Sequence, residues 1–493
     1  MTPDLANDFT TNPFADDKLR EECGIFGIKG KESAATMVAL GLHALQHRGQ
    51  EAAGIVSSDG EHFNAHHAMG HVGETFNQPS IIDRLAGHSA VGHVRYATSG
   101  ETALRNVQPF FTDFAFGGFA IAHNGNITNA YTLRGQLVRE GRLFRSTSDT
   151  EVILHLMAKV ASGGPVERLT AALKQIEGAY SLVCLAKNIM IGVRDPYGVR
   201  PLVLGRIDQS WVLASETCAL DIIGAEFIRD VKPGELVTIR NGEMHSSFPF
   251  APVPRRFCIF EYIYFARPDS TLEGQSVYEM RKQIGIELAK ESPIEADIVV
   301  PVPDSGVPSA IGYAQQSGLP FDLGIIRNHY VGRTFIQPTE RIRHLGVKLK
   351  HNANRRFIDG KRVVLVDDSI VRGTTSIKIV EMLRHAGAKE VHVRISSPPT
   401  KHSCFYGVDT PEKEKLLAHN YTVEQMAKLI GADSLAFISL EGLYRAVGET
   451  GRNAALPQYC DACFSGDYPI SLTDMDSSIG QGQISVLRAQ TSG

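Results

Sequence analysis

The sequence lacks any apolar run long enough to cross a membrane, so we expect no membrane-spanning helix and no membrane partner. Its first 22 residues have neither a basic start nor an apolar segment, so we expect no secretory signal. Without export, we place the protein in the cytoplasm. Its seven cysteines should then stay reduced instead of forming disulfides.

The sequence also lacks a marked excess of charge. Its Lys and Arg residues number 50 and its Asp and Glu residues 54, for a net charge of −4. Proteins that bind nucleic acid usually carry a basic surface, so we expect no nucleic-acid partner. Hydrophobic residues make up 43% of the 493 positions and charged residues 21%, a mix typical of a soluble protein with two or three domains.

Residues 23–252 have the pattern of a mixed α+β domain. Short apolar runs bounded by turn residues predict strands at "CGIFGI", "AAGIVSS", "AVGHVRYAT", "FAIAHNGNI", "AYSLVCLA", "IMIGVRD" and "SWVLASE". Apolar residues at helical spacing predict helices at "SAATMVALGLHALQH" and "SDTEVILHLMAKVA". The preceding segment, 1–22, carries six acidic and two basic residues, and its composition alone predicts a disordered tail.

A second domain is predicted at residues 253–469, after the proline-rich stretch "PFAPVPRR" (249–256). Near-continuous apolar runs predict its strands at "ADIVVPVPDSG", "FDLGIIRN", "RVVLVDDSI" and "EVHVRISSP". Helical stretches such as "SIKIVEMLRHAGAKE" separate these runs, which predicts a doubly wound parallel sheet. Residues 470–493 are rich in Ser, Gly and Gln, and we predict a flexible C-terminal tail there.

The stretch "VVLVDDSIVRGTTS" (363–376) combines a buried strand, two carboxylates and a loop that leads into a helix. Asp367 and Asp368 stand at the carboxyl end of the strand, where ligands bind in open α/β sheets. The loop could present N–H groups and hydroxyls to a phosphate at the start of the helix. The alternative is that the aspartates and Ser369 merely cap that helix.

This stretch resembles the binding motif of type I phosphoribosyltransferases. The resemblance implies an α/β domain in which Asp367 and Asp368 bind the ribose hydroxyls of phosphoribosyl pyrophosphate. It assigns the 5′-phosphate to the loop that contains Ser369, Gly373, Thr374 and Thr375. The turn "PVPDSGVPS" (301–309) matches the pyrophosphate-side loop, and its Ser305, with the two aspartates, matches a site for one Mg²⁺ per subunit. The stretch 327–343 resembles a loop that closes over the substrate.

A second group of candidates lies in the first domain, where Cys23 begins a predicted strand. Asn124 and Gly125 offer a side-chain amide and a backbone N–H that could form an oxyanion hole. Arg95 is a lone charge in an apolar strand, and Asp149 stands just before a helix. Taken singly, Cys23 could be a small buried hydrophobe and Asp149 a helix N-cap.

As a set these residues resemble the glutaminase domain of class II glutamine amidotransferases, which are N-terminal nucleophile hydrolases with an αββα sandwich. The resemblance implies that Cys23 is the nucleophile and must be the first residue, because its own α-amine is the general base. Such an amine has a pKa of about 7.7–8.0, suited to neutral pH. Residues 1–22 would then be a propeptide. The resemblance assigns Arg95 to the α-carboxylate of glutamine and Asp149 to its α-ammonium.

Four further cysteines lie in the second domain: Cys258, Cys404, Cys460 and Cys463. Four thiols confined to one domain of a cytoplasmic protein suggest a metal site, and their spacing fits zinc and an iron–sulfur cluster equally well. The remaining two, Cys184 and Cys218, lie in apolar strands and are most simply core residues.

All four contexts, and the propeptide, resemble the cluster-bearing branch of the glutamine phosphoribosylpyrophosphate amidotransferases. This resemblance runs from Cys23 to about Pro469. It implies one structural 4Fe–4S cluster per subunit and a glycosyltransferase with glutaminase activity. That enzyme catalyses the first committed step of de novo purine synthesis, with ammonia passing between its two sites. A homotetramer and feedback inhibition by purine nucleotides are further expectations from the family.

Two other functions remain open at this point. A class II amidotransferase such as the hexosamine-forming synthase would have a sugar isomerase as its second half, without "VVLVDDSIVRGTT". A non-enzymatic regulator could use a phosphoribosyltransferase fold to sense the sugar pyrophosphate. It would have no need of Cys23, Arg95, Asn124 or Asp149, and it usually carries a DNA-binding domain.

Overall fold

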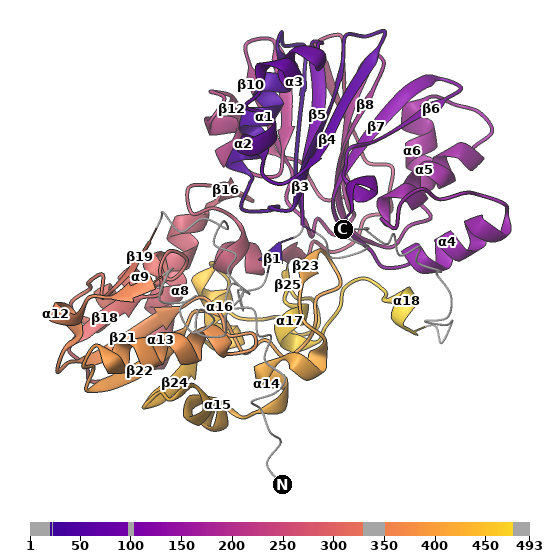
Figure 1. Ribbon diagram of the computed structural model, residues 1–493. Coiled ribbons are helices and arrows are strands. Elements are labelled where there is room, and N and C mark those ends of the chain that lie inside the picture. Colours follow the sequence, from indigo (N-terminus) through magenta and orange to yellow (C-terminus); the bar gives the residue numbers. More distant parts are fainter. Residues whose placement is uncertain (1–19, 22, 97–102, 329–350, 477–493) are drawn as a thin grey trace, which may run out of the picture.

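The computed structural model describes residues 20–21, 23–96, 103–328 and 351–476. Its first domain lies at the top of Figure 1 and its second domain at the bottom. Between Ser247 and Phe257 the chain has no helix or strand, and this segment coincides with the proline-rich stretch. None of the helices in the described residues is long and apolar enough to cross a membrane.

The first domain contains a seven-stranded sheet in the order β12-β10-β11-β2-β5-β3-β4. The strands are β2 (Cys23–Lys29), β3 (Ala52–Ser58), β4 (Phe63–Met69), β5 (Ser89–Arg95), β10 (Val203–Ile207), β11 (Ser210–Ala214) and β12 (Glu226–Asp230). Because β2 and β5 are antiparallel neighbours in the centre of the sheet, Cys23 at the start of β2 stands opposite Arg95 at the end of β5.

A six-stranded sheet, β14-β13-β9-β8-β7-β6, packs face to face on the first. The strands are β6 (Phe110–Phe114), β7 (Gly117–Ile127), β8 (Gly178–Ala186), β9 (Ile189–Arg194), β13 (Leu236–Arg240) and β14 (Glu243–Ser247). Ile25 and Val91 of the first sheet share a buried cluster with Ala122 and Val183 of the second. These apolar side chains point inward from both sheets, so the space between the sheets is a dry core.

Helices cover both outer faces of this pair of sheets (Figure 1). On one side lie α1 (Ala34–Ala44), α2 (Val72–Thr75), α3 (Pro79–Arg84) and α7 (Cys218–Asp221), and on the other α4 (Ala130–Arg139), α5 (Thr150–Lys159) and α6 (Pro165–Leu173). The four layers form an αββα sandwich, so the fold class predicted for this domain is confirmed.

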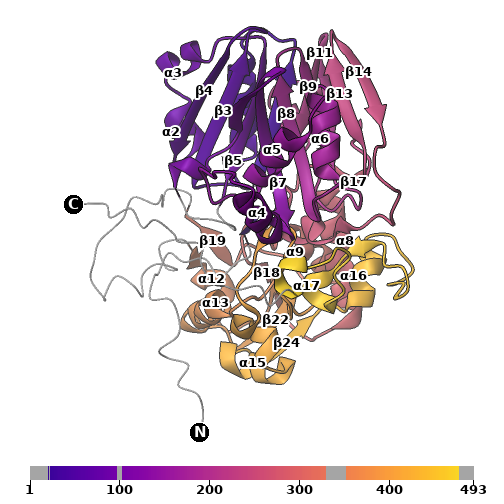
Figure 2. The same ribbon diagram turned by 90° about the vertical axis from the view of Figure 1, so that its right-hand side faces the viewer.

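The second domain is built on a four-stranded parallel sheet in the order β18-β21-β22-β24. Its strands are β18 (Ile298–Pro301), β21 (Arg362–Asp367), β22 (Glu390–Ile395) and β24 (Ser434–Phe437). One face packs against α8 (Val277–Glu291) and α9 (Val307–Ser317), and the other against α13 (Thr374–His385) and α15 (Val423–Ile430). Figure 2 shows the same layers from the side. The predicted α/β phosphoribosyltransferase fold is confirmed.

Smaller elements complete this domain: β15 (Phe257–Cys258), the π-helical segment η2 (Glu261–Phe265), β16 (Thr271–Leu272), β17 (Gln275–Ser276), α12 (Arg355–Ile358), β23 (Val408–Asp409), α14 (Leu417–Asn420), α16 (Leu440–Ala446), β25 (Tyr459–Cys460) and α17 (Ala462–Ser465). The predicted strand "FDLGIIRN" meets the parallel sheet only at its first residue, where Phe321 forms a single parallel bridge with Val299 of β18. Its later part forms β19 (Ile325–Arg327), which pairs antiparallel with β20 (His351–Ala353). Only Ile325 of β19 is buried, whereas a strand of a sheet covered on both faces needs both of its faces buried.

The predicted flexible tail begins too early. Residues 470–476 dock on the first domain, where they include helix α18 (Thr473–Asp476). The carboxylate of Asp474 accepts hydrogen bonds from the backbone N–H groups of Tyr131 (2.7 Å) and Thr132 (3.0 Å) at the start of α4. This is a helix cap supplied from about 340 residues away, so local composition could not indicate it. The rest of the predicted tail, 477–493, lies outside the described residues.

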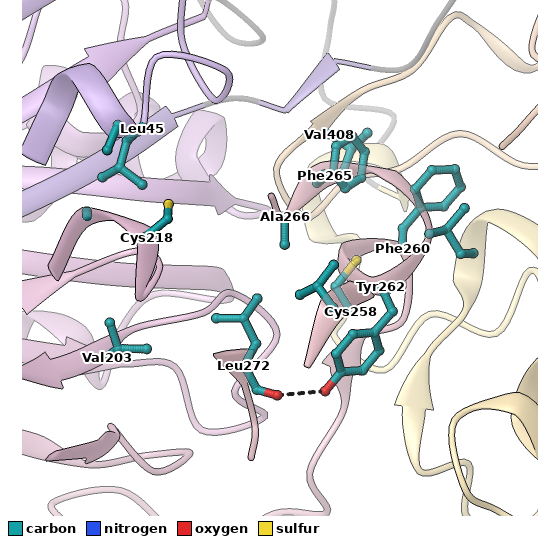
Figure 3. Packing of buried hydrophobic residues seen from close by; sticks show 14 of the residues in the cluster. Leu45, Val203, Cys218, Cys258, Phe260, Tyr262, Phe265, Ala266, Leu272 and Val408 are labelled. Carbon is teal, nitrogen blue, oxygen red and sulfur yellow. Dashed lines mark hydrogen bonds between the residues drawn. The ribbon is translucent and has the colours of Figure 1, made fainter. Parts of the chain in front are cut away.

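One hydrophobic cluster continues from the first domain into the second (Figure 3). Leu45 and Cys218 belong to its first-domain part, and Phe260, Tyr262 and Phe265 to its second-domain part. The two domains therefore share a core. Within it the hydroxyl of Tyr262 donates to the carbonyl of Leu272 at 3.0 Å.

This hydrogen bond gives a test of how much a buried contact inside this cluster stabilises the protein. Tyr262→Phe keeps the ring but removes the donor, so we expect the free energy of unfolding to fall by about 1–2 kcal/mol. Tyr278→Phe is the control, because that side chain is 37% exposed. Urea denaturation followed by fluorescence measures both. Equal unfolding midpoints for the two variants would contradict the role of the buried bond.

Candidate functional site

Cys23 and Arg95 lie side by side at the ends of two central strands of the first sheet. Cys23 is 8% exposed and Arg95 is 5% exposed. Arg95 is opposite Cys23 on one side and opposite Ala52 on the other. The carbonyl of Arg95 accepts a hydrogen bond from the N–H of Glu51 at 3.0 Å. The fold thus brings together a thiol and a guanidinium-bearing residue that lie far apart in the sequence.

Asn124 and Gly125 belong to β7, near its end in the second sheet. Asn124 is fully buried, and in the described part of the chain neither atom of its side-chain amide has a hydrogen-bond partner. A buried amide without partners is costly unless it is used by a ligand. Gly125 has φ +142°, and a Cβ there would lie 2.0 Å from the carbonyl oxygen of Ala179, so only glycine fits. Both features suit an oxyanion hole.

Asp149 is the N-cap of α5. One of its oxygens accepts from the N–H of Thr150 at 2.8 Å, and the other accepts from the N–H of Ile127 at 3.0 Å. The carboxylate therefore ties the start of α5 to the end of β7, two residues after Gly125. The simple interpretation as a helix cap is correct, and the predicted contact with a glutamine α-ammonium stays a prediction.

The second group of candidates meets at the carboxyl ends of β18 and β21. Asp367 ends β21, and both it and Asp368 are buried. The hydroxyl of Ser305 donates to one oxygen of Asp368 at 2.5 Å, and the hydroxyl of Ser369 donates to the other at 2.6 Å. Oxygen atoms of this kind are the ligands that Mg²⁺ prefers. The predicted set of Ser305, Asp367 and Asp368 is thus collected at one place and fits a magnesium ion.

The predicted phosphate loop leads directly into α13. Gly373 is the residue before this helix, and its φ of +84° is a conformation that favours glycine. In the described structure no side chain caps the start of α13, and its first turn, which begins with Thr374 and Thr375, contains no acid. The N–H groups of such a helix start favour an anion. Of the predicted closing loop, 327–343, residues 329–343 lie outside the described part.

The four predicted ligand cysteines converge. Cys258 pairs with Cys460 between the parallel strands β15 and β25. The carbonyl of Cys463 accepts from the N–H groups of Lys401 (3.0 Å) and His402 (3.1 Å), close to Cys404 in the sequence. Burial raises the pKa of Cys258 to about 12, and Cys404 adds to this rise. Burial also raises the pKa of Cys460 and Cys463, and in each case other thiols of the group raise it further.

These thiols are near enough to raise one another's pKa, but they do not surround a single metal ion. No group of three or more His, Cys, Asp or Glu side chains in residues 20–21, 23–96, 103–328 and 351–476 could hold one metal ion. A tetrahedral zinc site needs sulfur atoms about 3.8 Å apart, whereas a four-iron cluster needs them roughly 6–7 Å apart. The 4Fe–4S cluster stays a prediction. All seven cysteines are free of disulfides.

Comparison with known proteins covers both domains. A glutamine amidotransferase domain model matches residues 93–221, and a phosphoribosyl transferase domain model matches residues 277–413. The chain is 56% identical to an amidophosphoribosyltransferase of Rhizobium etli over 484 residues, which cover 97% of this chain and 98% of that protein. It is 48% identical to the Bacillus subtilis amidophosphoribosyltransferase over 455 residues, 92% of this chain and 95% of that protein. This chain belongs to the amidophosphoribosyltransferases.

Solved structures agree with this assignment. The glutamine phosphoribosylpyrophosphate amidotransferase from B. subtilis, complexed with ADP and GMP, superimposes with a TM-score of 0.87 at 47% identity. The match covers 91% of this chain and 98% of that one. Amidophosphoribosyltransferases are enzymes of purine biosynthesis, so the predicted function is confirmed. This match to both domains excludes the two other functions, the hexosamine-forming synthase and the non-enzymatic regulator.

Sequence reasoning missed a buried ionic junction of this amidophosphoribosyltransferase. Arg48 is fully buried, and its Nε donates to Glu216, which also bonds His47 at 2.6 Å. Burial alone would lower the pKa of Arg48, but the carboxylates of Glu216 and Glu261 outweigh it and raise the pKa. The available signal was Glu261, a lone acid in the aromatic run "FEYIYF", because a buried charge of this kind needs a partner.

The unpartnered amide of Asn124 gives a direct prediction. Asn124→Asp keeps the shape but replaces the donor by a carboxylate, so we expect kcat for glutamine hydrolysis to fall about 10²–10³-fold with little change in KM. The control is Asn129→Asp, because the Asn129 amide donates to Gln175 and accepts from Glu177. That variant should lose stability while kcat is kept. A normal kcat for Asn124→Asp would remove Asn124 from the oxyanion hole.

Proposed function

We propose that this chain hydrolyses glutamine at Cys23 and joins the released ammonia to phosphoribosyl pyrophosphate at the second site, giving 5-phosphoribosylamine, glutamate and pyrophosphate. The register that places Cys23 opposite Arg95 carries the first half of this proposal. The hydrogen bond of Ser305 with Asp368 at the carboxyl ends of two parallel strands supports the second half.

The first reaction uses the thiol and the free α-amine of Cys23. The amine takes the thiol proton, and the thiolate attacks the side-chain carbonyl carbon of glutamine. The N–H groups of Asn124 and Gly125 stabilise the oxyanion that forms. The C–N bond breaks, ammonia leaves with the proton returned by the amine, and water then cleaves the thioester to give glutamate. Before residues 1–22 are removed, the amine is part of a peptide bond and cannot act as the base.

At the second site the chain's own residues orient the sugar. Asp367 and Asp368 accept hydrogen bonds from the ribose hydroxyls, and the start of α13, from Gly373 to Thr375, holds the 5′-phosphate. Ammonia attacks C1 of the ribose as the bond from C1 to the pyrophosphate oxygen breaks. A Mg²⁺ held by Ser305 and the two aspartates would offset the negative charge of the pyrophosphate. Because ammonia is readily protonated and lost in water, its transfer inside one chain favours synthesis.

We further propose a structural 4Fe–4S cluster on Cys258, Cys404, Cys460 and Cys463. Such a cluster would join β15, at the start of the second domain, to β25, near its end. Arg20 and Glu21 lie close to this part of the domain, because their backbone pairs with Val408–Asp409. Purine nucleotides are proposed as regulators, since the B. subtilis enzyme was solved with ADP and GMP. The cytoplasmic location and the homotetramer stay predictions.

The two-site proposal is tested by separating the activities. Cys23→Ala should abolish synthesis from glutamine and leave synthesis from added ammonia nearly intact, since the sugar site is separate. Asp368→Asn should reduce both routes, because they share that site, while glutamine hydrolysis without the sugar is less affected. Phosphoribosylamine formation and glutamate release measure the two reactions.

Loss of both routes in a correctly folded Cys23→Ala protein would contradict two separate sites. Unchanged synthesis in both Asp367→Asn and Asp368→Asn would show that the two aspartates do not bind the sugar.

The cluster is tested by iron content. Anaerobically purified protein should contain about four iron atoms and four sulfides per chain. Cys460→Ser should give little soluble protein, and what remains should lack iron. Cys184→Ala is the control, because Cys184 is a buried cysteine of β8 outside the group. Tightly bound zinc without iron in active protein would refute the cluster and leave a four-cysteine site.

A further inference from the structure

Glu261 of the second domain is held by two arginines of the first. It opens the segment η2 and is fully buried. Its carboxylate accepts from Nη2 of Arg48 at 2.8 Å and from Nη2 of Arg200 at 2.8 Å. Both arginines are fully buried as well. Ion pairs without water are strongly directional, and breaking one leaves a charge uncompensated, so this junction fixes how the two domains meet.

Arg48 leads from this junction to the strand that carries Arg95. Gly49 follows it, and a Cβ on Gly49 would lie 2.5 Å from the carbonyl carbon of Val94 and 2.6 Å from the nitrogen of Arg95. The turn that begins at Arg48 thus presses its backbone on the end of β5. That end stands opposite Cys23. A displacement of Arg48 would therefore move the residue assigned to the glutamine α-carboxylate.

Arg200 leads from the same junction to the oxyanion strand. Its carbonyl accepts from the hydroxyl of Ser181 at 3.2 Å, and Ser181 pairs with Asn124 between β8 and β7. A Cβ on Gly407 would lie 3.0 Å from Cα of Gly125 and 3.6 Å from Cδ of Arg200. The side chain of Arg200 therefore packs beside the place where the second domain touches Gly125.

On its other side, η2 is connected to the sugar site. Arg281 is fully buried, and its Nε donates to the carbonyl of Tyr262 (3.1 Å) while its Nη2 donates to that of Ala266 (2.6 Å). These contacts lie along the segment that Glu261 opens. The carbonyl of Arg281 itself accepts from the hydroxyl of Ser309 at 3.1 Å, and Ser309 is the last residue of the turn 301–309 that contains Ser305. Arg281 thus lies between η2 and the turn of the sugar site.

We propose that Glu261 is a positioning residue which the phosphoribosyltransferase domain supplies to the glutaminase site. Through Arg48 it fixes the position of the strand end that carries Arg95. Through Arg200 it fixes the position of the strand that carries Gly125. Arg281 fixes the segment that Glu261 opens to the rest of the phosphoribosyltransferase domain. The inference rests on the proposed function, because it needs glutamine hydrolysis at Cys23.

The test compares Glu261→Gln with a matched variant, Glu273→Gln. Glu273 is also a nearly buried carboxylate of the second domain, but it pairs with Arg194 (2.5 Å) and Arg255 (2.9 Å). For Glu261→Gln we expect kcat/KM for glutamine hydrolysis to fall about tenfold or more, with ammonia-dependent synthesis within about twofold of the wild type. Glu273→Gln should keep both quantities.

Two further variants test the connection through Arg48 and the connection through Arg200 separately. They also replace Glu261→Gln if that variant does not fold. Arg48→Lys should mainly raise KM for glutamine, because it loosens the strand of Arg95. Arg200→Lys should mainly lower kcat, because it loosens the oxyanion strand. A general loss of stability would change neither parameter selectively, and thermal unfolding measures that loss separately.

The proposal is overturned if Glu261→Gln hydrolyses glutamine like the wild type, or if it loses both activities in equal proportion. It is also overturned if Arg48→Lys and Arg200→Lys change neither KM nor kcat. Failure of the proposed function would give a different result, because Cys23→Ala would then still hydrolyse glutamine.

Discussion

The contact of one buried carboxylate with two buried arginines links the two halves of this enzyme beside the glutaminase strands. Glu261 belongs to the sugar-binding half, and Arg48 and Arg200 belong to the glutaminase half. The hydrophobic cluster that spans both halves excludes water from these ion pairs, which makes them directional. Apolar packing alone would let one surface slide on the other. The ionic junction defines one arrangement, in which the β5 end and the oxyanion strand are both linked to the same acid.

This arrangement suits a reaction whose intermediate is ammonia. In the proposed reaction, the first half releases ammonia beside Cys23, and the second half consumes it at the carboxyl ends of β18 and β21. The residues between them include η2 and the segment that carries Cys404, so the proposed cluster lies in the same region as the domain contact. Asn126 of the oxyanion strand donates to the carbonyl of Phe405 at 2.9 Å, next to that cysteine. Loss of the cluster should therefore disturb the glutaminase site as well as the local fold.

Local patterns in the sequence predicted much of this account. The stretch 363–376 contains a strand, two carboxylates and a helix start, so Asp367, Asp368 and Gly373 could be recognised together. Relations over long distances were out of reach of such patterns. Ser305 meets Asp368 across 63 residues, and only the family resemblance suggested it. The sequence analysis missed the cap that Asp474 supplies to α4, and it missed the partners of Glu261. The neighbouring residues in the sequence give no indication of which distant group forms each hydrogen bond.

The central claim is that Cys23, as the first residue of the mature chain, is the nucleophile. The most direct measurement is mass spectrometry of active protein after reaction with a glutamine analogue that carries an electrophilic carbon in place of the side-chain amide. The account predicts a chain that begins at Cys23, with one adduct on that residue and inactivation of the glutamine-dependent route alone. An active chain that still begins before Cys23, or an adduct on another of the seven cysteines, would contradict it.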